Sequence, residues 1–143
     1  MGIEDVEIDF LILADQAEVL NGKLYMMGGA WDRRMIRDIK VPVGISMVIG
    51  VLVPWTLTNQ QHSLQIKLVD GDGNTIGQQA AASIAVGRPI GATAGQSFRA
   101  MAVINGSWTL PGYGAYSAIV TVSDRTEKRV VFYAVEPSGE PGG

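Results

Sequence analysis

The sequence contains no cysteine, which excludes thiolate zinc sites, iron–sulfur clusters and cysteine nucleophiles. It has a single histidine, His62, so a histidine-rich metal site cannot form within one chain. Charge is also scarce, because Asp, Glu, Lys and Arg make up 17% of the residues where about 25% is usual. The net charge is −3, without a concentrated basic excess, and we therefore expect no nucleic-acid partner.

The longest uncharged segment spans residues 41–66. Its apolar part, residues 41–57, reaches the lower limit for a membrane-spanning helix. Proline and glycine interrupt it, and Val and Ile dominate, which favours a strand. We expect a long buried strand at residues 43–53 and no membrane span.

Acidic residues occupy the start of the sequence, where a signal peptide needs positive charge followed by an apolar run. They are Glu4, Asp5, Glu7 and Asp9. We therefore expect no export signal and a cytoplasmic location.

The two arms around a charged segment at residues 124–129 alternate between apolar and polar residues. Tyr116, Ala118, Val120 and Val122 share one face of the first arm, and residues 130–135 form the returning strand. Similar patterns recur along the chain and predict an all-β fold of about eight strands. We expect a single antiparallel β-sandwich, immunoglobulin-like, with a jelly-roll or C2-like sandwich as the alternative. It should span residues 1–135, followed by a flexible tail at 136–143.

Tyr116 enters its strand in a Gly-x-Tyr sequence that begins at Gly114. This arrangement resembles the tyrosine corner of immunoglobulin-like sandwiches, in which the phenol bonds to nearby backbone. We expect Tyr116 to be a buried structural residue whose hydroxyl bonds to the backbone near residues 110–112.

Two Asn-Gly pairs, at 21–22 and 105–106, carry the strongest short signal for a hairpin turn. Residues 14–20 are compatible with one or two helical turns, but so short a helix would be marginal. Residues 76–86 are rich in alanine, which favours helix, yet glycines bracket them as they do strands. We interpret this second segment as a strand.

Asp70, Asp72 and Asn74 place three oxygen-bearing side chains at a spacing of two in a glycine-rich loop. Such ligands suit calcium, but an EF-hand loop starting at Asp70 needs glycine where Thr75 stands and glutamate where Ala81 stands. The same residues are typical of a β-turn. We expect a turn, with calcium binding as the alternative, and no other metal or cofactor.

No catalytic residues are expected. His62 and Ser63 are adjacent, so they would point to opposite faces of a strand, and no nucleophile-elbow sequence is present.

A basic cluster follows Trp31, and it suggests either a phosphate site or a solvated loop whose arginines pair with Asp32 and Asp38. We favour the loop; the cluster comprises Arg33, Arg34, Arg37 and Lys40. Five aromatic residues suit core anchors better than a sugar platform: Trp31, Trp55, Trp108, Tyr113 and Tyr116.

The strand expected at residues 43–53 lacks charge on both faces. Since a sandwich strand normally keeps one solvated face, we expect a partner to cover the second face, with Val48 and Leu52 in the contact. The alternative is that the loops at 28–40 and 87–97 fold over it.

Three parts of the chain resemble a family of uncharacterised bacterial single-domain proteins of this length. They are Ala14-Asp15 to Leu24 with Gly28 to Asp32, Val53-Pro54-Trp55 through Asn59 and His62 to Gly73, and Leu110-Pro111 to Tyr116. The resemblance covers roughly residues 6–135 and implies a β-sandwich, but no activity and no site residues.

Taken together, these patterns indicate a non-enzymatic structural or interaction module. We expect it to form a homo-oligomer or to bind another protein. The alternative is a ligand-binding sandwich, which would take carbohydrate on Trp and Tyr or calcium at the Asp70 loop.

Overall fold

The structure is a computed structural model and describes residues 5–137. Within these residues it contains nine strands, one short 3₁₀ turn and no α-helix. The elements are β1 (Glu7–Leu20), β2 (Lys23–Gly29), β3 (Arg33–Met35), β4 (Val43–Val53), η1 (Trp55–Leu57), β5 (Gln61–Asp70), β6 (Thr75–Ala85), β7 (Phe98–Trp108), β8 (Gly114–Val122) and β9 (Thr126–Val135).

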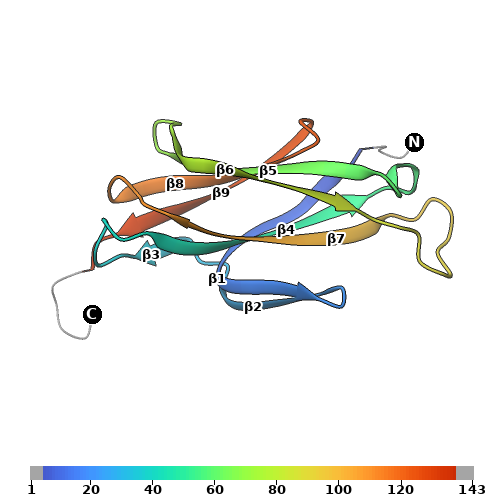
Figure 1. Cartoon of the computed structure of the whole chain (residues 1–143), viewed down its shortest axis with the longest axis horizontal. Helices are drawn as coiled ribbons and strands as arrows, with labels where there is room; N and C mark the ends of the chain where they lie inside the picture. Colours follow the sequence, from blue (N-terminus) through green and yellow to red (C-terminus); the bar gives the residue numbers. More distant parts are fainter. Residues whose placement is uncertain (1–4, 138–143) are drawn as a thin grey trace.

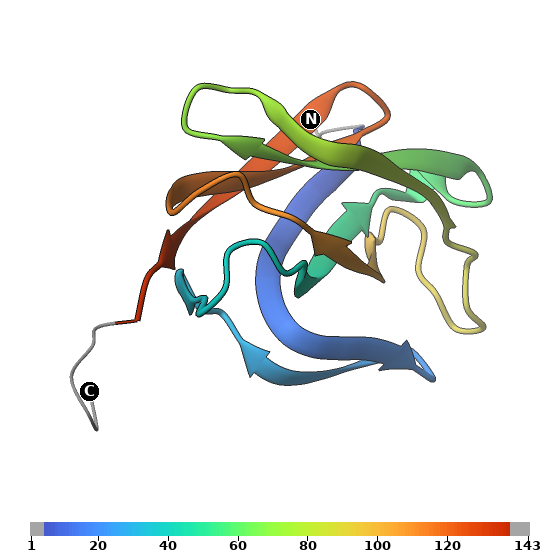
Figure 2. The same cartoon turned by 60° about the vertical axis from the view of Figure 1, so that its left-hand side comes forward.

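The strands form two packed sheets, one in the order β2-β1-β4-β7 and the other in the order β3-β9-β8-β5-β6. Figures 1 and 2 show the two layers. All pairings are antiparallel except the short parallel one between β3 and β9. The predicted all-β sandwich is confirmed. The sequence predicts about eight strands, and the structure adds the three-residue β3. The predicted boundary between domain and tail stays a prediction, because residues 138–143 lie outside the described part.

The core lies between the two sheets and is built from the inward faces of all the strands except β2 and β3. Burial of one such aliphatic or aromatic side chain contributes about 1.5–3 kcal/mol. The largest fully buried side chains are Phe132, Leu13, Ile45, Met47, Ile49, Leu64, Ile66, Leu68, Leu110, Val48, Val51 and Val53.

β4 has the bounds that the sequence predicts, Val43–Val53, and lies between β1 and β7. Its inward residues belong to the core, as the alternation requires. Its outward face is also covered in part, because the Phe10 ring of β1 lies where a side chain at Gly50 would project. The cover at this position therefore comes from a neighbouring strand, and not from the loops at 28–40 or 87–97.

A β-bulge in β1 changes which residues face the core. The register with β4 shifts between Ile8 and Phe10. Leu11 and Leu13 are therefore buried in the core, while Phe10 and Ile12 lie opposite Gly50 and Val48 on the outer face. Local alternation does not reveal this change of face, since the apolar residues at 6, 8, 10 and 12 alternate with Glu7 and Asp9 as if they lay on one side.

β1 continues to Leu20 without a helix and turns into β2 at Asn21 and Gly22, which have φ of 51° and 73°. The predicted Asn-Gly hairpin is therefore present. β1 pairs with β4 only as far as Ala14, and from there onwards it pairs with β2. Figure 2 shows the resulting bend of β1, which makes the 14–29 hairpin stand away from the two layers.

The second predicted turn, at Asn105 and Gly106, is wrong. β7 runs through both residues and pairs with β4 in an unbroken register. Gly106 is needed for another reason: the Trp108 ring occupies the space beside it, and a Cβ at Gly106 would lie 2.5 Å from a ring carbon. Close approach, rather than a turn, explains this glycine.

Two further boundaries differ from the predictions. β9 begins at Thr126, so the turn is shorter than residues 124–129, and Ser123 and Asp124 adopt positive φ of 53° and 56°. The expected loop at residues 33–35 is instead β3, parallel to the end of β9. Tertiary pairing decides both cases, and local sequence does not record it.

Candidate interaction surface

Two edge strands lie side by side on one side of the molecule. β6 ends one sheet, β7 ends the other, and the two are in contact. Figure 1 shows the loop that joins them extending past the ends of both strands. Each strand has 11 residues, and Arg99 is the one residue with formal charge in the two together. This side of the sandwich therefore presents two long edges almost without charge.

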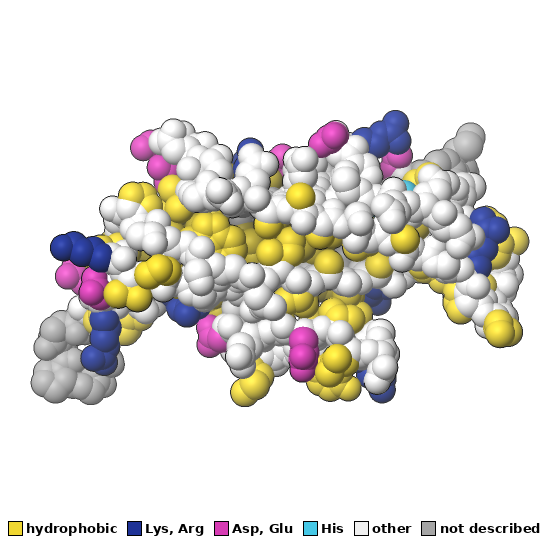
Figure 3. All heavy atoms as spheres, in the orientation of Figure 1, with side chains coloured by type: hydrophobic (Ala, Val, Ile, Leu, Met, Phe, Trp, Pro, Cys, Tyr) yellow, Lys and Arg dark blue, Asp and Glu magenta, His cyan; other side chains and the backbone are white. Residues whose placement is uncertain are grey.

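The core is open between these two strands. Ala100, Ala102 and Ile104 pack against the core from β7, yet each remains partly exposed. Ala80 and Ile84 do the same from β6. In Figure 3 hydrophobic side chains form a band between the two strands. We call this band, with its five residues, the open seam.

The other edges carry features that discourage further pairing. Before Tyr133, no strand within residues 5–137 pairs with the outer side of β9. This part of β9 carries Glu127, Lys128 and Arg129. Charged side chains are a usual protection of such edges. β2 belongs to the hairpin that leaves the sheet, with Gly28 at a positive φ of 61°.

β6 and β7 differ in regularity. The β5–β6 register shifts between Ile66 and Leu68, and Gly77 of β6 has φ of 65°. Such a bulge twists an edge and disfavours pairing. β7, in contrast, pairs with β4 from Phe98 to Trp108 without interruption. Of the edges described, β7 is therefore the long one that neither charge nor a bulge protects.

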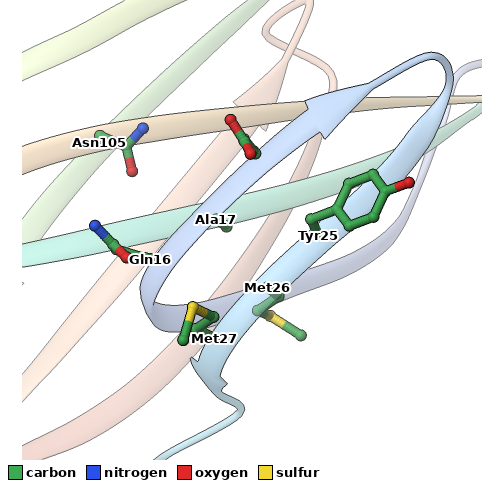
Figure 4. Close-up of a pocket in the computed structure, with 7 residues that line it drawn as sticks. Gln16, Ala17, Tyr25, Met26, Met27 and Asn105 are labelled. Atoms are coloured by element: carbon green, nitrogen blue, oxygen red, sulfur yellow. The ribbon is translucent and has the colours of Figure 1, made fainter.

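A hollow of about 480 Å³ separates the 14–29 hairpin from β7. Figure 4 shows Gln16 from β1 with Tyr25 and Met27 from β2 on one side, and Asn105 from β7 on the other. Tyr25 is 52% exposed and Met27 is 69% exposed. The hollow thus combines amide groups with exposed aromatic and thioether side chains.

Val48, which the sequence places in an interface, is 0% exposed. Leu52 on the same face is half-buried. Next to Val48, the Ser46 hydroxyl donates a hydrogen bond to Asn105 Oδ1 on β7. Val48 therefore offers no free surface, and a partner on this face would contact the residues around it.

Tyr116 is buried and makes the backbone contact that the sequence predicts. It is 4% exposed, and its hydroxyl donates a hydrogen bond to the Gly112 carbonyl oxygen at 2.6 Å. Its ring stacks on Phe132 with centroids 5.7 Å apart. The predicted contact is present, and it ties the start of β8 to the preceding loop.

The Asp70 loop is a hydrogen-bonded turn. Asp70 Oδ1 accepts from the backbone N–H groups of Asp72 and Asn74, both at 2.9 Å. The Asn74 side-chain amide donates to Asp70 Oδ2 at 3.3 Å. These bonds, led by the Asn74 backbone N–H, lower the pKa of Asp70. The carboxylate is therefore satisfied by its own turn.

His62 is buried, and its Nε2 lies 2.8 Å from the Leu57 carbonyl oxygen. Ser63 is exposed on the opposite side of β5, as strand alternation requires. Nearby, the Arg88 guanidinium lies 3.9 Å above the Trp55 ring and donates to the Trp55 carbonyl oxygen at 2.8 Å. These contacts hold the η1 turn against the 86–97 loop.

The basic cluster and the aromatic set do not form one site. Arg34 pairs with Asp15 at 3.3 Å and lies over the Trp31 ring, so it does not use the predicted partners Asp32 and Asp38. Trp31 packs edge-on against Phe132. Of the five aromatic residues considered for a sugar platform, only Tyr113 is as much as 38% exposed.

The sequence does not predict that the 14–29 hairpin contributes an exposed surface. It also does not predict the open seam between β6 and β7. A signal for the seam existed, because residues 76–86 and 100–123 carry no charge. The pattern could not identify β6 and β7 as neighbouring edges, since that depends on strand order.

The described residues contain no cluster of three or more His, Asp or Glu side chains able to hold a metal ion. Within the same residues no helix is long and apolar enough to cross a membrane.

No curated protein and no solved structure matches the chain. A family model does match, over residues 9–135, in agreement with the resemblance seen in the sequence. The chain belongs to DUF6941, a family of unknown function.

Proposed function

We propose that this protein is a non-enzymatic interaction module that associates with itself. One observation carries the proposal: β7 is a long, regular and nearly uncharged edge strand beside the open seam. The unpaired N–H and C=O groups of such an edge are a template for another strand. Covering the seam would also remove apolar surface from water, which contributes about 25 cal/mol per Å².

We propose an immunoglobulin-like topology for the sandwich, and the strand orders support it. β1, β4 and β7 take the places of strands A, B and E in one sheet, and β5, β8 and β9 take those of C, F and G in the other. Tyr116 at the start of β8 then stands where a tyrosine corner belongs. In this assignment the place of strand D, beside β7, has no occupant within the described chain.

The proposed compartment is the cytoplasm. The chain has no cysteine, so its folding requires no oxidising environment. Cell fractionation with an antibody against the protein tests the location, and recovery outside the cytoplasm would contradict it.

Ligand binding is the second candidate function. The hollow between the 14–29 hairpin and β7 favours it more than the tryptophans do, because Tyr25 is exposed there beside Gln16 and Asn105. Amide groups next to an aromatic ring suit a carbohydrate. Calorimetric titration with soluble oligosaccharides tests this alternative, with Tyr25→Ala as the variant that should lose any binding.

Sedimentation across a range of protein concentrations tests self-association. We expect the mass of the native chain to be a multiple of 15.2 kDa. Ile104→Lys should reduce that mass, because Ile104 is partly exposed in the seam and a lysine there can reach water only while the seam stays open.

The matched control is Val131→Lys. Val131 is 40% exposed and lies on β9, away from the seam. This variant adds the same charge and should leave the mass unchanged. Circular dichroism shows whether both variants stay folded. A native chain that sediments as a monomer at every concentration would overturn the proposal.

A further inference from the structure

We infer that β7 of one copy pairs antiparallel with β7 of a second copy about a twofold axis. This inference rests on the proposed self-association and names the strand, the partner and the direction. It extends the sheet from β2-β1-β4-β7 into the same sheet of the partner.

The partner that pairs with the free side of β7 is an extended strand of the second copy. β7 pairs with β4 on one side throughout its length, from Phe98 to Trp108, and no described strand pairs with its other side. Backbone N–H and C=O groups on that free side are available for pairing, and a parallel or antiparallel strand bonds to them in series. A helix or a flat apolar surface would leave them unpaired.

β7 is a better pairing edge than β6. A second strand must follow the edge over several residues, and the bulge at Gly77 interrupts β6 near its start. β6 has a different part in the contact: its exposed residues include the small Ala81, Ala82 and Ala85. Small side chains allow the β6 strands of two copies to come near each other when the β7 edges pair.

The placement of charge favours a second copy in the antiparallel direction. Arg99 is the one charged residue of β7 and lies near its beginning. With the axis near Val103, each Arg99 faces Ser107 of the partner, and the two arginines are about 27 Å apart at about 3.4 Å per residue. Each Arg99 also forms an ion pair with Asp9 of its own chain. Parallel pairing would bring the two ion pairs to about 5 Å, the spacing of neighbouring strands, and would place like charges opposite each other that antiparallel pairing keeps apart.

The open seam points to the same partner. Ala100, Ala102 and Ile104 are partly exposed on the core-facing side of β7. Twofold pairing places the same residues of the second copy beside them, so both seams are covered by one contact. Such a self-complementary interface closes after two copies, and it needs no surface beyond what this chain carries.

A cysteine scan tests the inference directly, because the natural chain has no cysteine and each variant has a single thiol. Residues 100–105 are replaced one at a time by cysteine and oxidised under mild conditions. Facing residues in an antiparallel pair have Cα atoms about 4.5–5.5 Å apart, within the range of about 4.4–6.8 Å that a disulfide needs. Each step away from the axis separates the two thiols by about 7 Å, twice the rise per residue.

We expect the yield of cross-linked dimer to peak at one or two neighbouring positions near Val103 and to fall on both sides. The control is Val131→Cys on β9, which lies away from the seam and should cross-link weakly. A peak at this control, or equal yields along β7, overturns the inference when sedimentation still shows association. The proposed function then remains standing. A monomeric native chain overturns both.

Discussion

The Tyr116 hydroxyl and the Gly112 backbone exchange two hydrogen bonds. The hydroxyl donates to the Gly112 carbonyl oxygen at 2.6 Å, and the Gly112 N–H donates to the hydroxyl oxygen at 3.3 Å. Because the ring of Tyr116 is buried against Phe132, the hydroxyl is held in place by packing. The two bonds fix the segment from Gly112 to Tyr116, through which the chain enters β8.

Tyr116→Phe should therefore destabilise the protein by about 1–2 kcal/mol. The substitution keeps the packing but removes two part-buried hydrogen bonds to the Gly112 backbone. A hydrogen bond contributes about 0.5–1.5 kcal/mol. Urea denaturation measures the change in the free energy of unfolding. Tyr133→Phe is the matched control, because Tyr133 is 46% exposed and should change stability by less than about 0.5 kcal/mol. Equal effects of the two substitutions would contradict the assignment.

Much of the fold can be predicted from local pattern. β4 has the predicted bounds because an uncharged segment rich in Val and Ile, with a proline at each end, favours a buried strand over a helix or a loop. The hairpin at Asn21 and Gly22 forms because both residues accept positive φ. In these cases the deciding forces act within a few residues, which is why the sequence is informative.

The features of the fold that the sequence does not predict share a different cause. The bulge between Ile8 and Phe10 reverses the faces of β1, and the parallel partner of β3 lies about 100 residues further along the chain. Gly106 resembles a turn residue but serves the packing of Trp108. Each of these depends on contacts between distant segments, and no local pattern records such contacts.

The candidate surface was predictable only in part. The shortage of charge indicates that some face is covered or paired, and it led to Val48 as an interface residue. The structure shows Val48 fully buried within the chain, while β6 and β7 carry exposed and partly exposed residues that are almost all uncharged. Which strands become edges is set by the order of the sheets, so composition alone could not locate the surface.

Val48→Lys should unfold the protein, whereas Leu52→Lys should leave it folded. Val48 is 0% exposed, and a buried unpaired lysine belongs to the substitutions that cost more than about 4 kcal/mol. Leu52 lies on the same face of β4 but is half-buried, so the flexible lysine chain can reach water from there. Thermal unfolding followed by circular dichroism separates the two. A stable, folded Val48→Lys protein would show that this face is open in solution.

Asp70 should make stability depend on acid pH. Hydrogen bonds from the turn, first that of the Asn74 backbone N–H, lower its pKa in the folded state below the ordinary value of 3.8. A carboxyl with a depressed pKa stabilises the fold above its unfolded pKa and loses this contribution as pH falls through the folded value. The melting temperature of Asp70→Asn should thus be lower than that of the native chain at neutral pH, and the difference should shrink below pH 3.8. Asp72→Asn removes the same charge two residues away and controls for the change in net charge.

Calcium should not change the melting temperature. Both oxygens of Asp70 already accept hydrogen bonds within the turn, and Asn74 turns its amide N–H toward that carboxylate. An ion that bound the folded state would raise stability by RT ln(1 + [L]/Kd). Differential scanning fluorimetry with millimolar calcium and with a chelator measures the effect. A rise of several degrees with calcium would mean that the loop binds the ion.

Gly106→Ala should destabilise the protein although alanine suits a strand better than glycine does. A Cβ at Gly106 would lie 2.5 Å from the Trp108 ring, which is buried and cannot move freely. Overpacking of this kind costs about 1–3 kcal/mol. Gly44 is the matched control, because it lies on the neighbouring strand opposite Ser107 and a Cβ there meets nothing within 4 Å. Gly44→Ala should leave stability unchanged or raise it by about 0.4–1 kcal/mol through a less flexible unfolded chain. Urea unfolding followed by tryptophan fluorescence compares the two, and a Gly106→Ala protein as stable as the Gly44→Ala protein would show that Trp108 does not occupy this space.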